Sequence, residues 1–329
     1  MSHNHLTGLF DRLVSSAFFS PPFNGYDVAE SFHALVFLTG PFAYKMRKPS
    51  IVPGIVDYST PALRGTLLKR EIELNSVFGH SLYEEVIPVY HDGHTGYNRT
   101  GNGTIVDHVL KMKQMPAECL MSSQLENDYP FSENDMLKLA QTVARFHENA
   151  PPVIRPYTAR MQAGAERAIQ FFAQRMTSER SRTAVSRTRA AFADLGPIME
   201  NRAQQGFVKD IHGDLRFCNI FFVAGRYYIF DRIEYDDDLR IQDITMDVAA
   251  TITDLLAYGK TLLAKTYLDE YCRLTGDDKI RVLLPLYLSI KAMVSSSIAF
   301  ELRSQTQDQE KREFYSTQVD RFLDVVCRI

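Results

Sequence analysis

An otherwise helical second half of the sequence is interrupted once, by strand-like apolar runs over residues 207–222 and 226–230. Within and directly after these runs stand Asp214, Asn219 and Asp231, three side chains with oxygen ligands. Burying acidic groups beside apolar strands is costly unless a cation neutralises them. Magnesium prefers oxygen ligands and keeps substrate phosphates in its coordination shell. The segment therefore predicts a site for Mg²⁺ and a nucleotide.

The periodicity of apolar residues divides the chain into a strand-rich first portion and a helical second portion. The change falls at Met115 and Pro116. We therefore predict an α+β fold with two lobes. Residues 1–115 would form a nucleotide-binding lobe, and residues 116–329 a helical lobe with the catalytic loop and the acceptor site. Strands are expected over residues 33–39, 42–46, 86–90 and 104–112, and helices over 8–18, 61–78, 133–149, 160–177, 181–204, 243–258, 260–274, 279–303 and 309–327.

Composition argues against several classes of partner. The chain has 37 basic and 40 acidic residues and a net charge of −3, so it lacks a general attraction to nucleic acid or anionic membranes. None of the four cysteines forms a Cys-x-x-Cys pair, which favours free thiols in a reducing compartment. The N-terminus has no basic region followed by an apolar one, and no apolar run reaches about 20 residues. We expect a cytoplasmic protein without nucleic-acid or membrane partners.

The spacing around Asp214 is typical of a kinase catalytic loop: His-x-Asp-x-x-x-x-Asn, followed by an apolar strand that ends in Asp. In this interpretation Asp214 orients and deprotonates an acceptor hydroxyl, and Asn219 and Asp231 hold the metal. Arg216 would offset charge on the transferred phosphoryl group, and His212 would support the loop. The alternative is a buried polar turn with incidental acids.

The first portion supplies the cation and carboxylate that such a site needs for the nucleotide phosphates. Lys45 alternates with apolar neighbours on a predicted strand, and Glu71 lies on the helix that follows. Lys48 and Glu73 are the alternatives, and ordinary surface charge is another. The hairpin over residues 35–42 is expected to cover the phosphates, although it holds one glycine and no glycine-rich motif.

The predicted boundary between the lobes is where an adenine would meet backbone groups. Lys113 and Met115 are the candidates there. A plain linker fits the same residues equally well. The predicted cofactors are ATP and Mg²⁺, with the choice of ATP over GTP left open.

These motifs resemble the aminoglycoside phosphotransferase-like superfamily, which has a kinase-like fold. The resemblance is closest to a bacterial family that is often fused to a P-loop kinase domain, and we expect no such domain here. It implies a bilobal protein-kinase-like fold of the aminoglycoside and choline phosphotransferase type, in which Asp247 braces the catalytic loop. Cys218 departs from the glutamate common in that family. The matching stretches are residues 30–38, 43–49, 56–60, 71–75, 146–147, 211–220 and 230–247.

The resemblance also places the acceptor beside an acidic cluster that follows Asp231. A cationic or sugar-like acceptor would be drawn there, with Asp236 and Asp243 as candidate contacts. A solvated loop is the alternative, and Asp243 also suits a helix N-cap. The function expected is ATP-dependent transfer of a phosphoryl group to a hydroxyl of a small molecule. A protein-directed kinase and a catalytically silent nucleotide-binding regulator remain as alternatives, and the acceptor and the oligomeric state stay open. The cluster comprises Glu234, Asp236, Asp237, Asp238 and Asp243.

Overall fold

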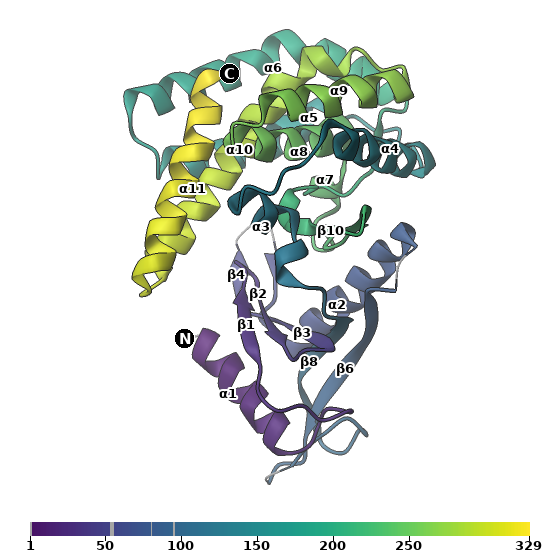
Figure 1. The fold of residues 1–329 in the computed structure, drawn as a ribbon, viewed down its shortest axis with the longest axis vertical. Helices are drawn as coiled ribbons and strands as arrows, with labels where there is room; N and C mark the ends of the chain where they lie inside the picture. Colours follow the sequence, from purple (N-terminus) through teal and green to yellow (C-terminus); the bar gives the residue numbers. More distant parts are fainter. Residues whose placement is uncertain (1, 53–55, 80, 95) are drawn as a thin grey trace. The chain divides into compact units, whose positions relative to one another are not determined.

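The computed structural model describes residues 2–52, 56–79, 81–94 and 96–329. These residues form two compact units, which we describe separately. Unit 1 is Met1–Pro116 with Glu234–Asp236, and unit 2 is Ala117–Ile233 with Asp237–Ile329. An antiparallel sheet dominates unit 1 and helices dominate unit 2, which confirms the predicted α+β class (Figure 1).

Unit 1 is built on a six-stranded antiparallel sheet with the order β1-β2-β3-β8-β6-β7. Its first three strands form a meander, and β8 inserts between β3 and β6. A short antiparallel pair, β4 and β5, precedes α2. The elements are α1 (Ser2–Ser15), β1 (Asp27–Glu30), β2 (Ala34–Leu38), β3 (Phe42–Arg47), β4 (Ile51–Val52), β5 (Val56–Asp57), α2 (Pro61–Asn75), a 3₁₀ turn (Ser76–Phe78), β6 (Tyr83–His91), β7 (Tyr97–Asn98) and β8 (Thr104–Lys113).

The two faces of this sheet are covered differently. On one face, Tyr44 and Met46 of β3 join a buried apolar cluster with Leu6, Phe10 and other residues of α1. On the other face, Ala43 packs in a cluster with residues of α2 and β8. Because side chains alternate along a strand, β3 directs its odd-numbered residues toward α2. This alternation explains why Lys45 meets the α2 helix.

The register of the meander bears on the predicted phosphate cover. The turn at residues 39–41 joins β2 to β3 as predicted, but the Pro41 carbonyl accepts a hydrogen bond from the Gln114 amide (3.2 Å). The turn at residues 31–33 lies at the other end of β2, where Ala34 pairs with Arg47. Adenine and γ-phosphate are opposite ends of a nucleotide, so the predictions for the 39–41 turn and for the adenine segment do not fit together, and the turn at residues 31–33 is the alternative cover.

Unit 2 is a helical assembly with two short strand pairs, β9 with β12 and β10 with β11. Helix α8 is almost wholly buried. Helix α10 is long and apolar enough to span a membrane, but 72% of its most apolar window is buried, as in a core helix. The elements are a 3₁₀ turn (Ala117–Cys119), α3 (Met121–Glu126), α4 (Glu133–Asn149), α5 (Thr158–Ala173), α6 (Glu179–Gln204), β9 (Val208–Asp210), a 3₁₀ turn (Phe217–Asn219), β10 (Ile220–Val223), β11 (Arg226–Ile229), α7 (Asp237–Arg240), β12 (Ile241–Asp243), α8 (Thr245–Ala257), α9 (Thr261–Thr275), α10 (Ile280–Gln305) and α11 (Gln309–Arg328).

Candidate active site

The backbone of the predicted catalytic loop is held by one fully buried carboxylate of α8. Asp247 accepts hydrogen bonds from the amides of His212 (2.8 Å) and Gly213 (2.9 Å). Its Oδ2 also contacts Nε2 of His147 (3.1 Å), whose Nδ1 meets the Tyr271 hydroxyl (2.7 Å). Burial alone would raise the pKa of Asp247, but the hydrogen bond to His147 and its neighbours hold that pKa below its usual value. The loop therefore rests on a charged anchor, as expected for Asp247.

Gly213 is required by the path of this loop. Its φ of 86° lies in the left-handed region, which side chains with a Cβ rarely adopt. A Cβ at this position would also lie 2.7 Å from the Leu239 carbonyl oxygen and 3.0 Å from Cδ1 of Ile233. The glycine of the His-Gly-Asp sequence is therefore a steric requirement of the loop.

His212 supports the loop through both ring nitrogens. It is fully buried; its Nε2 lies 2.9 Å from the Phe230 carbonyl, and the Asp214 amide donates to its Nδ1 (3.3 Å). This pattern requires a neutral ring that donates from Nε2 and accepts at Nδ1. Burial lowers the pKa of His212, which favours the same neutral form.

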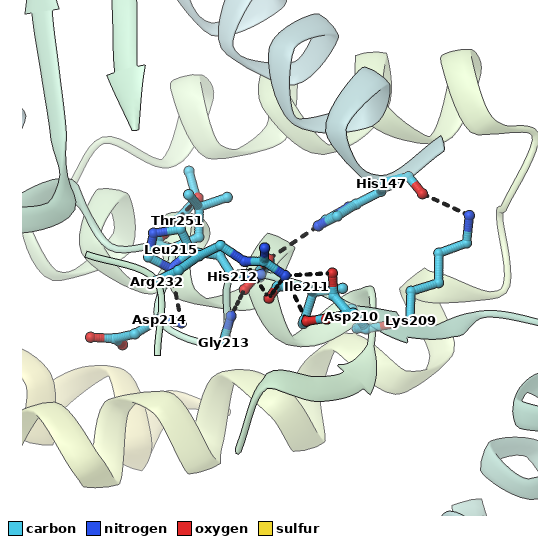
Figure 2. A network of polar contacts seen from close by, with 12 residues as sticks. His147, Lys209, Asp210, Ile211, His212, Gly213, Asp214, Leu215, Arg232 and Thr251 are labelled. Carbon is cyan, nitrogen blue, oxygen red and sulfur yellow. Dashed lines mark hydrogen bonds and ion pairs between the residues drawn. The ribbon is translucent and has the colours of Figure 1, made fainter. Parts of the chain in front are cut away.

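Asp214 is clamped on both sides and still reaches the surface. Nδ2 of Asn219 donates to the Asp214 carbonyl (2.9 Å) and approaches its Oδ2 (3.4 Å). On the other side, Nζ of Lys291 lies 3.3 Å from Oδ1 and 2.5 Å from the Gly213 carbonyl. The Asp214 side chain remains 36% exposed, and in Figure 2 its carboxylate points away from the polar network. Lys291 was not among the residues predicted for this loop.

Arg216 is engaged by a buried aspartate. Its guanidinium lies 3.3 Å from Oδ1 of Asp254, and Oδ2 of Asp254 accepts the Phe217 amide (2.7 Å). The Arg216 side chain is 19% exposed. Asp254 is thus a second anchor of the loop that sequence reasoning missed. The predicted role of Arg216 toward a phosphoryl group stays a prediction.

The two predicted metal ligands, Asn219 and Asp231, each have a side-chain oxygen that could bind a metal ion. Asn219 uses its Nδ2 on Asp214, and no described residue donates to its Oδ1. Asp231, at a left-handed φ of 61°, directly follows Phe230, whose amide donates to the Asn219 carbonyl (3.1 Å). The thiol of Cys218, the residue before Asn219, has its pKa raised to about 12, first by burial and also by the charges of Asp214, Asp254 and Asp231. These carboxylates therefore act on a common region.

This donor set fits magnesium better than a self-contained metal centre. Within the part of the chain that the structure describes, no three His, Cys, Asp or Glu side chains converge to hold a metal. Mg²⁺ commonly binds through one or two protein oxygens while substrate phosphates and water complete its shell. An amide oxygen on Asn219 and a carboxylate on Asp231 match that pattern.

In unit 1, the predicted cation and carboxylate meet in a buried cluster. Nζ of Lys45 lies 2.8 Å from Oε1 of Glu71, and their side chains are 7% and 0% exposed. Arg47, on the same side of β3, contacts Oε2 of Glu71 (2.6 Å) and Oε1 of Glu234 (2.5 Å). The Tyr58 hydroxyl also donates to Glu234 (3.1 Å). Arg47 and Glu234 were not predicted as members of this cluster.

The structure also shows the contacts of Lys48, the alternative to Lys45, and of the two adenine candidates, Lys113 and Met115. Lys48 pairs with Glu30 (2.7 Å) and not with Glu71. Lys113 donates from its amide to the Leu82 carbonyl (2.8 Å) and from its ammonium to the Ser81 hydroxyl (2.7 Å). Among the described residues, no hydrogen bond engages the backbone of Met115. Met115 therefore keeps both backbone groups for a ligand, whereas the amide of Lys113 is occupied.

The structure corrects the expectation for Asp243. This residue is fully buried, and Arg202 contacts both of its carboxylate oxygens (2.7 and 3.0 Å). Its Oδ1 also accepts the amide of Thr245 at the start of α8 (2.9 Å). Asp243 is thus a structural anchor with no surface for an acceptor. Asp236 lies in the half-buried end of the 234–236 segment of unit 1, and its predicted acceptor contact stays a prediction.

No family model matches the sequence. Two uncharacterized mycobacterial proteins, Rv2004c of Mycobacterium tuberculosis and Mb2027c of Mycobacterium bovis, are each 25% identical to it over 287 residues. The alignments cover 83% of this chain and 54% of each relative. The chain therefore spans about half the length of the curated relatives it matches.

Solved structures match over nearly the whole chain. The GDP complex of aminoglycoside 2′-phosphotransferase-IIIa has a TM-score of 0.57 and 13% identity, and covers 97% of this chain and 98% of its own. A choline/ethanolamine kinase family protein from Mesorhizobium loti has a TM-score of 0.55 and 12% identity, with coverages of 98% and 99%. The chain thus has the kinase-like fold of the aminoglycoside phosphotransferase and choline/ethanolamine kinase structures.

Proposed function

We propose that this chain transfers the γ-phosphoryl group of ATP to a hydroxyl group of a small molecule, with Asp214 as the general base. The observation that carries the proposal is the arrangement around Asp214. Asn219 and Lys291 hold its carboxylate, and yet 36% of the side chain stays exposed. A base needs this combination, because it must be fixed in position and within hydrogen-bond reach of the hydroxyl.

The chain's own residues divide the work of the reaction. Asp214 would orient the acceptor hydroxyl and accept its proton as the oxygen attacks phosphorus. Lys45, held by Glu71 at 2.8 Å, would bind phosphate oxygens as a fixed positive charge. Oδ1 of Asn219 and the carboxylate of Asp231 would hold Mg²⁺, which neutralises charge on the phosphates when it is bound. Positioning and electrostatic stabilisation supply most of the rate in this chemistry.

The nucleotide would be bound by backbone as well as side chains. Met115 has the backbone groups to pair with the base, as described above. For the phosphate cover, we assign the turn at residues 31–33 in place of the hairpin over 35–42. This turn is closed by hydrogen bonds between Ser31 and Ala34 (2.9 and 3.1 Å) and contains no glycine. The similar phosphotransferase holds GDP, so both ATP and GTP belong in the assays.

The spacing after Asp231 favours a small-molecule acceptor over a protein. Only residues 232–236 separate Asp231 from α7. Protein kinases carry an activation segment after the equivalent aspartate, and it organises the site for a protein substrate. Five residues are too few to form such a segment.

The proposal is tested by nucleotide consumption against a panel of sugars, amino sugars and amino alcohols. We expect Mg²⁺-dependent turnover with at least one acceptor, and a loss of about 10²–10⁴-fold in Asp214→Ala. Asp194→Ala, at an exposed position of α6, is the matched control and should behave as wild type. Equal turnover in Asp214→Ala and wild type would remove Asp214 from its assigned role. Nucleotide binding without any turnover would favour a silent regulator.

A further inference from the structure

Three carboxylates of the acidic stretch that the sequence suggests for a cationic acceptor are already balanced by arginines. Arg240 contacts Asp237 (2.7 Å), and Arg155 contacts Asp238 (2.9 Å). Asp243 is held by Arg202, as described above. Within unit 2, these three carboxylates therefore offer little net negative charge to an incoming ammonium group.

The carboxylates of the catalytic loop are balanced as well. Arg216 lies against Asp254, and Lys291 lies 3.3 Å from Asp214. In the proposed function the Asp231 carboxylate binds Mg²⁺. Asp214, Asp231, Asp254 and the three carboxylates above thus each have a positive partner or an assigned one, so none of these six is reserved for a cationic substrate.

Lys291 is fixed in place by the helix that carries it. It lies in the middle of α10, where it is the only charged residue between Arg281 and Glu301. The residue is 8% exposed, and its ammonium is held by the Gly213 carbonyl (2.5 Å) as well as by Asp214. A buried ammonium is costly to desolvate and persists only where such partners compensate it. Its charge is therefore a permanent feature beside the proposed base.

We propose that the acceptor is a hydroxyl compound without positive charge, and that Lys291 is the residue that excludes a cationic one. This inference rests on the proposed function, because the hydroxyl must come within hydrogen-bond reach of Asp214. An ammonium group on the same small molecule would then stand within several ångströms of the Lys291 charge. Asp214 balances the Lys291 charge in the resting site, but it loses its negative charge as it takes up the hydroxyl proton. The Lys291 charge is then unbalanced and repels the ammonium group, and water and salt only partly screen this repulsion.

The test uses radiolabelled ATP and a bacterial small-molecule extract that ion exchange has separated into cationic, neutral and anionic fractions. We expect label to enter the neutral or anionic fraction. Transfer mainly into the cationic fraction would overturn the inference. If no fraction is labelled although a nonhydrolysable ATP analogue with Mg²⁺ raises the melting temperature, the proposed function itself fails and the inference falls with it.

Variants of Lys291 then test its assigned role on a matched trio with one sugar framework: an amino sugar, the neutral sugar and the acidic sugar. In wild type we expect kcat/KM for the amino sugar to be lower than for the neutral sugar by about tenfold. Lys291→Met should abolish this ratio of kcat/KM values, while Lys291→Arg should retain it. Structural damage would lower kcat/KM for the amino sugar and the neutral sugar together and leave their ratio unchanged. Lys279→Met, at an exposed position just before α10, is the control. An unchanged ratio in Lys291→Met would overturn the role of Lys291.

Discussion

The Lys45 cluster of unit 1 and the Asp214 loop of unit 2 hold charged groups in contrasting ways. Lys45 and Glu71 are almost fully buried, and Arg47 shares the same carboxylate. Asp214 is instead 36% exposed and is fixed from both sides by weaker contacts of 3.3 and 3.4 Å. The first arrangement suits a charge that must stay in place. The second arrangement suits a group that must be reached by a substrate from solvent.

The largest effect is expected from Glu71→Gln. This change leaves Lys45 and Arg47 without the carboxylate they share, and breaking a buried ion pair from one side costs about 3–5 kcal/mol. Urea unfolding should show this loss as a lower midpoint. Glu73→Gln, exposed on the same helix, should change the free energy of unfolding by less than about 0.5 kcal/mol. Similar losses in both variants would contradict the importance of the cluster.

Lys45→Met tests whether the buried cluster serves the nucleotide. We expect kcat/KM for ATP to fall by about 10²–10³-fold, because a fixed charge on the phosphates is removed. Lys48→Met removes the other lysine considered for this role, which the structure pairs with Glu30. Turnover in Lys48→Met should fall less than in Lys45→Met, because Lys48 donates to the Ser31 carbonyl (2.8 Å) and supports the assigned turn without meeting the phosphates. The assignment of Lys45 would be wrong if Lys48→Met lost more activity than Lys45→Met.

Gly213→Ala should destabilise unit 2 by about 1–3 kcal/mol, because it combines left-handed backbone strain with a clash against the Leu239 carbonyl. Gly225→Ala is a close control. Its φ of 77° is also left-handed, but nothing lies within 4 Å of the added Cβ. Thermal unfolding of the two variants separates the contact from the strain. Equal losses would show that the contact with Leu239 is unimportant.

The smallest effect is a dependence of stability on pH. Burial lowers the pKa of His212, so the folded protein keeps this ring neutral while the unfolded chain takes up a proton near pH 6.5. The unfolded state then binds more protons, and stability is lost as the pH falls below 6.5, by at most about 1.4 kcal/mol per pH unit for this group. Unfolding at pH 7.5 and 5.5 measures the slope. His212→Gln should flatten it, and an unchanged slope would assign the effect to other groups.

Local patterns predicted most of the elements because their signals lie within a few turns. Residues 133–149 form the predicted helix with the same bounds, since Ser132 caps it and apolar positions recur along one face. The first helix begins earlier than the expected residue 8, at Ser2, because Leu6 already belongs to its buried apolar face. The kinase-like spacing of Asp214 and Asn219 likewise corresponds to a hydrogen-bonded pair.

Features that depend on distant strands and helices were missed. The choice between the turns at residues 31–33 and 39–41 depends on strand register, which local pattern does not contain. Asp243 was wrongly expected to meet the acceptor. Its true partner, Arg202, lies on a helix 41 residues earlier in the sequence, so no local pattern pointed to the pair. Lys291 did carry a signal, because it is the one charged residue in the apolar stretch between Arg281 and Glu301. A lone lysine in such a stretch needs a buried carboxylate or carbonyl partner, and that reasoning would have found it.

The central claim is that Asp214 performs chemistry while other residues bind the nucleotide. The most direct measurement compares nucleotide affinity and the rate of phosphoryl transfer in Asp214→Asn and wild type, with the slow hydrolysis of MgATP as the reaction if no acceptor is at hand. We predict nucleotide affinity within about twofold of wild type and a transfer rate lower by at least about 10²-fold. A variant that transfers phosphate as fast as wild type would contradict the account.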